Sequence, residues 1–202
     1  MKDALMHRDL WIAGIGFAGV MLSWAAFLSF YPTLMLDTYE ISLRWSGGIL
    51  ALSIFVGGVA GLGVGYVVMA RDMRKSFLQV FGILMTLSYM GMILVDSIPV
   101  LVVMGILNGV AWGFFPILYT VPFWIRGIRP REVAVALAFI TVTLSVGAVV
   151  GPLSVGFLQS AFDDLRIALF IVSIPSMTLF VAGILMRRPV AEEATRSEAV
   201  PN

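Results

Sequence analysis

The hydrophobic positions of this chain fall into six long runs, and short polar or turn-forming segments separate them. Each run has about 20 residues or more, which is the length that an α-helix needs to cross the hydrocarbon of a bilayer. The pattern therefore predicts an all-α membrane protein with six transmembrane helices. The predicted spans are residues 10–31, 47–69, 77–95, 99–124, 133–160 and 166–186.

These spans define one membrane domain at residues 10–188, with a short segment on either side. Residues 1–9 form a polar N-terminal segment. The first apolar run is longer than the core of a secretory signal, so we interpret it as a helix and not as a cleaved peptide. Residues 189–202 are acidic and end next to a proline, which predicts a disordered tail.

The distribution of positive charge predicts the orientation of the helices. Eleven of the 13 Lys and Arg residues lie on one side of the predicted membrane, and only Arg44 and Arg166 lie on the other. The cytoplasmic segments of membrane proteins carry the excess of Lys and Arg. We therefore expect both termini in the cytoplasm. That side holds Lys2, Arg8, Arg71, Arg74, Lys75, Arg126, Arg129, Arg131, Arg187, Arg188 and Arg196.

The composition adds several exclusions. The chain is 60% hydrophobic and only 12% charged, which does not suit a soluble domain. It has no cysteine, which excludes disulfides and thiolate metal sites. No Asp, Glu, Lys, Arg or His lies well inside a span, so neither a proton-coupling carboxylate nor a buried catalytic pair can be assembled. We expect no enzyme activity, no cofactor or metal, and no nucleic-acid partner.

The fourth span, residues 99–124, has two different faces. One face has glycine at every fourth position: Gly105, Gly109 and Gly113. A second face carries hydrogen-bonding and aromatic side chains: Asn108, Trp112, Phe115 and Tyr119. The glycine face predicts close packing against another helix, and Pro116 predicts an interruption of the helix. The second face fits a solute cavity or, alternatively, hydrogen bonds that join helices.

The first span carries Phe17, Trp24 and Tyr31 at seven-residue spacing, so these aromatic side chains form one stripe. Trp24 lies too deep for the aromatic belt at the membrane surface, which favours a cavity position. Tyr31 lies near the end of the span and fits either the cavity or that belt.

Other spans carry small and hydroxyl-bearing residues at helical spacing. We expect the glycine positions of the second and fifth spans to be packing surfaces, and not binding sites. They are Gly57, Gly61, Gly147 and Gly151, with Pro152 directly after the last. Thr143 is a further cavity candidate, although hydroxyl groups in helices commonly bond to their own backbone carbonyls.

Two segments of the chain resemble known sequence motifs. Gly65 at the end of the second span is followed by a charged cluster: Arg71, Asp72, Arg74 and Lys75. The fifth span contains Gly147-xxx-Gly151-Pro152. These segments resemble the basic loop motif and the Gly-Pro signature of one six-helix half of a major facilitator superfamily transporter. Ala70 stands where the loop motif has an acidic residue, and Asp72 would replace that acid in a shifted register. Trp11 and Tyr31-Pro32-Thr33 make the chain more similar to the carboxy-terminal half.

The resemblance implies a fold and a function. In that family, helices 1 and 4 of each half line a central cavity, helices 3 and 6 lie outside, and the two halves rock around a midplane site. The function implied is transport of a small solute by alternating access. We expect the cavity wall to include Phe17, Trp24, Tyr31, Asn108, Trp112, Tyr119 and Thr143.

A lone half cannot enclose a cavity, so the resemblance also implies a partner. We expect a second six-helix half, either another copy of this chain or a separate chain, in the lipid bilayer of the cell (inner or plasma) membrane. A wall of aromatic and amide groups without charge suits a neutral, amphipathic or aromatic solute. Two alternatives stay open: a non-transporting membrane interaction or regulatory subunit, and a truncated fragment of a transporter.

Overall fold

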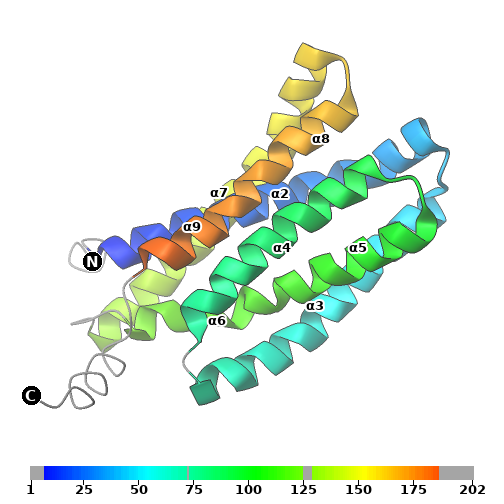
Figure 1. Cartoon of the computed structure of the whole chain (residues 1–202). Coiled ribbons are helices and arrows are strands. Elements are labelled where there is room, and N and C mark those ends of the chain that lie inside the picture. Colours follow the sequence, from blue (N-terminus) through cyan, green and yellow to red (C-terminus); the bar gives the residue numbers. More distant parts are fainter. Residues whose placement is uncertain (1–6, 72, 125–128, 187–202) are drawn as a thin grey trace, which may run out of the picture.

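The computed structural model describes residues 7–71, 73–124 and 129–186 (Figure 1). Six helical stretches in these ranges are long and apolar enough to cross a membrane, as the sequence predicts. They are Arg8–Tyr39, Leu43–Val67, Arg74–Leu94, Ile98–Phe123, Pro130–Phe162 and Leu165–Leu185. No strand occurs in the same ranges, so the prediction of an all-α fold with six long apolar helices is confirmed.

Four of the spans are continuous helices: α2 (Arg8–Tyr39), α3 (Leu43–Arg71), α4 (Arg74–Leu94) and α7 (Pro130–Phe162). The other two contain 3₁₀ turns. The fourth span consists of α5 (Ile98–Ala111), η1 (Trp112–Phe114), α6 (Phe115–Thr120) and η2 (Val121–Trp124). The sixth consists of α8 (Leu165–Ser173), η3 (Ile174–Met177) and α9 (Thr178–Leu185).

Both interruptions lie beside a proline. Pro116 has no N–H for the carbonyl of Trp112, four residues earlier, and the chain tightens into the turn η1 at that point. Pro175 has the same effect in the sixth span, where the carbonyl of Ile171 accepts a hydrogen bond from the N–H of Ile174 instead. Short 3₁₀ turns are a common way to satisfy such backbone groups.

The first helix extends further than the sequence predicts. The predicted span ends at residue 31, whereas α2 continues through Pro32 and ends where Glu40 adopts a left-handed conformation, with φ of 55°. The extension contains Pro32, Asp37 and Thr38, so a hydropathy pattern assigns it to a loop, although Leu34 and Met35 within it are fully buried. The hydroxyl of Tyr39 donates to the carbonyl of Ile93 at 2.7 Å and fastens this extension to the end of α4. The predicted tail, residues 189–202, lies outside the described residues.

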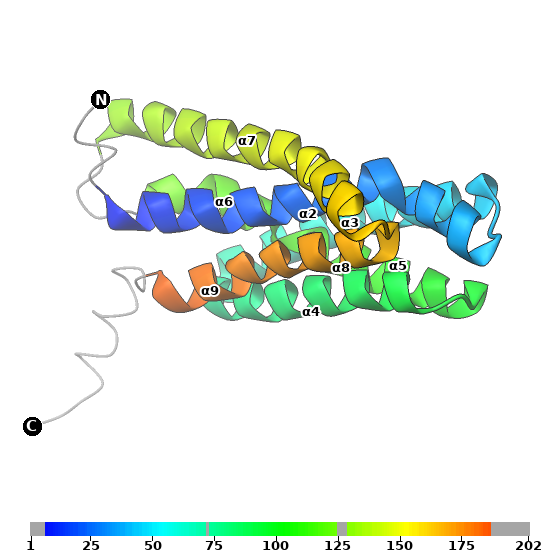
Figure 2. The same ribbon diagram turned by 90° about the horizontal axis from the view of Figure 1, so that it is seen from above.

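The six spans pack as a bent row. Their most extensive contacts run from α7 to α2, from α2 to the sixth span, from that span to α4, from α4 to the fourth span, and from there to α3 (Figures 1 and 2). In span numbers the order is 5–1–6–3–4–2. The helices at the two ends of the row are the least buried. Within an apolar stretch of 18 residues in each helix, 22% is buried in α7 and 28% in α3.

Glycine residues permit the closest approaches in this row. A Cβ atom at Gly147 or Gly151 of α7 would collide with the backbone of α2, at the carbonyl oxygens of Ala18 and Leu22. A Cβ at Gly109 would lie 2.5 Å from the carbonyl oxygen of Ser53 in α3. Such backbone-to-backbone contact is open only to residues without a side chain.

The remaining predicted packing residues lie along the same two seams. Gly105 faces Ile49, Gly113 faces Ala60 and Val64, Gly57 faces Trp112, Gly61 and Gly65 face Pro116, and Pro152 lies inside α7 one residue after Gly151. Gly156, one turn further along α7, faces open space.

The contrast between Gly151 and Gly156 provides a matched test of this packing. The variant Gly151→Ala places a methyl group against the α2 backbone, and we expect it to lower the free energy of unfolding by about 1–3 kcal/mol. Gly156→Ala adds the same methyl group to the same helix without a collision, so we expect a change within about 1 kcal/mol. Unfolding by SDS in mixed micelles measures both. Equal losses in the two variants would contradict the close contact at Gly151.

Candidate functional site

The aromatic side chains of the first and fourth spans meet near the middle of both helices. The indole of Trp24 in α2 packs edge-to-face against that of Trp112, with ring centroids 4.9 Å apart. Phe17, two turns earlier in α2, stacks on Phe114 with centroids 5.5 Å apart and planes 9° from parallel. Spans 6 and 3 lie between spans 1 and 4 in the row, so these contacts show that the row bends until spans 1 and 4 touch.

A groove runs along the surface beside the two indoles. It has a volume of about 350 Å³ and lies between spans 1, 2 and 4. Its wall is apolar and glycine-rich, formed by Trp24, Ile54, Gly57, Gly58, Gly61, Leu62, Trp112, Phe115 and Pro116. The glycines of α3 leave room for aromatic rings from the other spans. The groove can hold a small apolar or aromatic group.

One turn before Trp112, the side chain of Asn108 joins three spans by hydrogen bonds. Its Oδ1 accepts from the hydroxyl of Ser53 in α3 at 3.0 Å, and its Nδ2 donates to the hydroxyl of Ser88 in α4 at 3.0 Å. Ser88 in turn donates to the carbonyl of Met85 at 2.8 Å. All three polar side chains are buried. The amide therefore acts as a link between helices, one of the two interpretations that the sequence allows.

Three further polar atoms are buried near this network without a hydrogen-bond partner: Tyr31 Oη, Tyr89 Oη and Trp112 Nε1. The hydroxyl of Tyr89 lies beside the side chains of Asn108 and Trp112 and interacts with both, although neither contact has full hydrogen-bond geometry. Both the Trp112 N–H and the Tyr89 O–H can donate. An unsatisfied donor in an apolar interior is unfavourable by about 1–3 kcal/mol. A polar ligand atom that accepts hydrogen bonds would satisfy these donors once the neighbouring side chains move aside, because none of the three atoms has exposed surface.

The other predicted cavity residues lie at different distances from this centre. Tyr31 is fully buried and stacks on Phe27, which contacts Tyr89, so its position does not fit a lipid-facing aromatic belt. Tyr119 is exposed and reaches the groove only through Phe115. Thr143 packs against Gly14 of α2, outside the groove, and its hydroxyl bonds to the carbonyl of Ile140 in its own helix.

The segment that resembles the basic loop motif is described only in part. Asp72 and the side chain of Arg71 lie outside the described positions. Arg74 begins α4, and Lys75 donates to the carbonyl of Ile184 in α9 at 3.4 Å. The described part of the motif therefore links the start of α4 to the end of the sixth span.

Sequence reasoning missed the contribution of the third span. Beyond Gln79 near its start, its polar hydrogen-bonding residues are Thr86, Ser88 and Tyr89, and most of the span is apolar in sequence. In the structure Ser88 and Tyr89 belong to the Asn108 centre, and Thr86 shares a 2.6 Å hydrogen bond with Ser176 of the sixth span. The signal was present, because these few polar groups fall within one helical turn.

The described residues hold no group of three or more His, Asp or Glu side chains that could bind a metal ion. Comparison with known proteins assigns no family: no family model matches the chain, and no curated protein matches its sequence.

The Asn108 centre can be tested as a link between helices by double-mutant cycles. We expect the pairs Asn108→Ala with Ser53→Ala and Asn108→Ala with Ser88→Ala to show coupling energies of about 0.6 kcal/mol, and at most about 1.7 kcal/mol. The pair Asn108→Ala with Ser29→Ala is the control cycle and should show no coupling. Ser29 is exposed, and its hydroxyl donates to the carbonyl of Ala25 in its own helix. Additive effects in all three cycles would exclude the link.

Proposed function

We propose that this chain is one six-helix half of a facilitator-type secondary transporter, which moves a small solute by alternating access together with a second half. The observation that carries the proposal is the mid-span contact of Trp24 and Trp112, which brings the first and fourth spans together beside an open groove. A solute site at the midplane, formed by these two spans, is the arrangement that such transporters use.

The order of the spans supports the same assignment. Exchanging span 1 with span 4, span 2 with span 5 and span 3 with span 6 turns the row 5–1–6–3–4–2 into 2–4–3–6–1–5. This is the same row in reverse order. This symmetry fits a domain built from two three-helix units of opposite topology, as in the halves of major facilitator transporters. The pairing of glycine seams supports it too, because α7 packs on span 1 as α3 packs on span 4.

The chemistry of the centre restricts the solute. The groove offers aromatic and aliphatic surface, and the Trp112 N–H and Tyr89 O–H lie behind it, beside one another and without a well-aligned acceptor. No charged residue lies in the middle of the spans. The solute that fits is neutral, with an aromatic or apolar body and at least one oxygen or nitrogen that accepts a hydrogen bond. The proposed role is binding and translocation, and not catalysis.

A second half is required because a groove on one bundle does not isolate a solute from both sides of a membrane. The two least buried spans, α3 and α7, flank the groove side of the row and provide the surface for a partner. The proposed orientation has both termini in the cytoplasm of a cell-membrane protein. A non-transporting interaction subunit and a transporter fragment are the outcomes that would replace this proposal.

The mass of the purified particle is the first test. We expect the protein in nanodiscs, expressed alone or with the product of a neighbouring gene, to form a particle with two six-helix halves. Mass photometry or light scattering measures this mass. A strictly monomeric particle in both preparations would exclude alternating access by this chain.

Binding of small aromatic solutes tests the groove itself. We expect indole, benzamide or a related neutral probe to raise the thermal unfolding temperature of the paired particle. The variant Trp112→Phe keeps a ring but removes the N–H, and it should weaken binding by about tenfold, in line with the loss of a hydrogen bond of about 1.4 kcal/mol. Trp45→Phe, at the far end of α3, is the matched control and should bind normally. Equal binding by all three proteins would exclude Trp112 from the site.

A further inference from the structure

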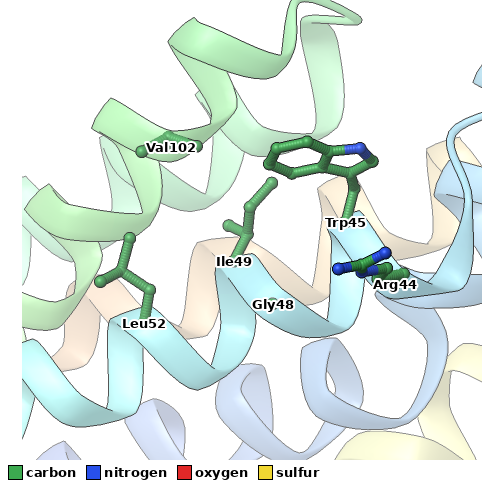
Figure 3. A pocket seen from close by; sticks show the side chains of 6 residues that line it. All are labelled: Arg44, Trp45, Gly48, Ile49, Leu52 and Val102. Atoms are coloured by element: carbon green, nitrogen blue, oxygen red, sulfur yellow. The ribbon is translucent and has the colours of Figure 1, made fainter.

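A second groove lies far from the Trp24–Trp112 centre, where α3 begins. It has a volume of about 460 Å³ and is lined by Arg44, Trp45, Gly48, Ile49, Leu52 and Val102 (Figure 3). The α3 and α5 helices are in tight contact at Gly105 and Ile49, and the groove opens beside this contact, where a Cβ atom added at Gly48 would meet open space. We call it the Arg44 groove.

The groove combines three chemical zones in sequence along α3. Arg44 lies in the first turn and places a cation at the end of the groove (Figure 3). Trp45 follows, with 52% of its surface exposed. Gly48, Ile49 and Leu52 then form an apolar floor that continues into the span. Cation, indole and hydrocarbon follow one another in the same order as the headgroup, interface and acyl region of a lipid leaflet.

Arg44 has no competing partner within the described part of the chain, where it makes no ion pair and no ring contact. The other cation at this end of the bundle differs, because the guanidinium of Arg166 lies 5.7 Å from the centre of the Tyr39 ring. A guanidinium forms bidentate hydrogen bonds with phosphate. An arginine that makes no ion pair with the described residues, at a groove open to lipid, is therefore a favourable partner for a lipid phosphate.

We propose that the Arg44 groove binds a phospholipid with a net negative headgroup. The lipid phosphate lies against the Arg44 guanidinium, the Trp45 indole packs at the level of the glycerol backbone, and one acyl chain follows the floor past Ile49 and Leu52. A soluble anion has no acyl chain to bury, so it would not contact the apolar side chains that form the floor of the groove. The site does not depend on the transport proposal, because it uses neither the central groove nor a second half.

Fluorescence quenching by brominated lipids tests the site directly. The protein is placed in phosphatidylcholine nanodiscs that contain equal fractions of dibrominated phosphatidylglycerol or dibrominated phosphatidylcholine. The signal of Trp45 is the difference between the wild-type protein and Trp45→Phe. We expect brominated phosphatidylglycerol to quench this signal roughly fivefold more effectively, because one cation near a membrane surface attracts an anionic lipid by that factor.

Two matched variants assign the preference to the groove. Arg44→Gln should remove the preference for phosphatidylglycerol, whereas Arg166→Gln, which removes the other cation at this end, should keep it. Thermal unfolding of both variants checks that the fold is intact, which the exposure of Arg44 favours. Equal quenching by the two lipids, or a preference that survives Arg44→Gln, would overturn the proposal. The quenching is also measured in inorganic phosphate, with sodium chloride at the same ionic strength as the control. If phosphate abolishes the preference for phosphatidylglycerol and sodium chloride does not, the ligand is a soluble anion and the proposal is overturned.

Discussion

The structure depends on direct backbone contact between helices at glycine positions. In a membrane the hydrophobic effect does not drive apolar helices together, because lipid tails are as apolar as their side chains. Close packing must supply the attraction instead. Gly147 and Gly151 bring α7 onto α2, while Gly109 brings the fourth span onto α3. These two seams hold the end helices of the row, which are otherwise the least buried.

Close packing of this kind does little to prevent one helix from sliding along its neighbour. Hydrogen bonds between polar side chains fix the helices against such a shift. The amide of Asn108 bonds at once to Ser53 and Ser88, so a shift of any of the three spans breaks a buried hydrogen bond. Thr86 and Ser176 restrict the third and sixth spans in the same way. The hydroxyl of Ser23 in α2 donates to the carbonyl of Val172 at 2.7 Å and links the first span to the sixth. Few polar residues suffice because each one joins different helices.

The site proposed for a solute follows from both restraints. With the seams and the amide link in place, Trp24 and Trp112 meet on the open side of the row, and Tyr89 lies behind them. The aromatic surface is then available to a ligand, while the donors of Trp112 and Tyr89 have no well-aligned protein acceptor. The Arg44 groove lies where the α3 seam ends, so it also exists because glycine packing stops at Gly105.

The sequence by itself determined the all-α class, the six spans, the asymmetry of charge and the glycine faces, because hydropathy and helical spacing are local properties of the chain. It identified Trp24 and Trp112 as unusual for the same reason: large polar-edged rings deep in apolar helices are visible without a partner. Only the tertiary structure decided that Asn108 links helices, that Ser88 and Tyr89 of an apolar-looking span join it, and that Thr143 lies outside the groove. Those outcomes depend on the rotation of each helix about its axis relative to its neighbours. That rotation is set by contacts between residues far apart in the chain, such as Gly151 with Leu22, which no local pattern records.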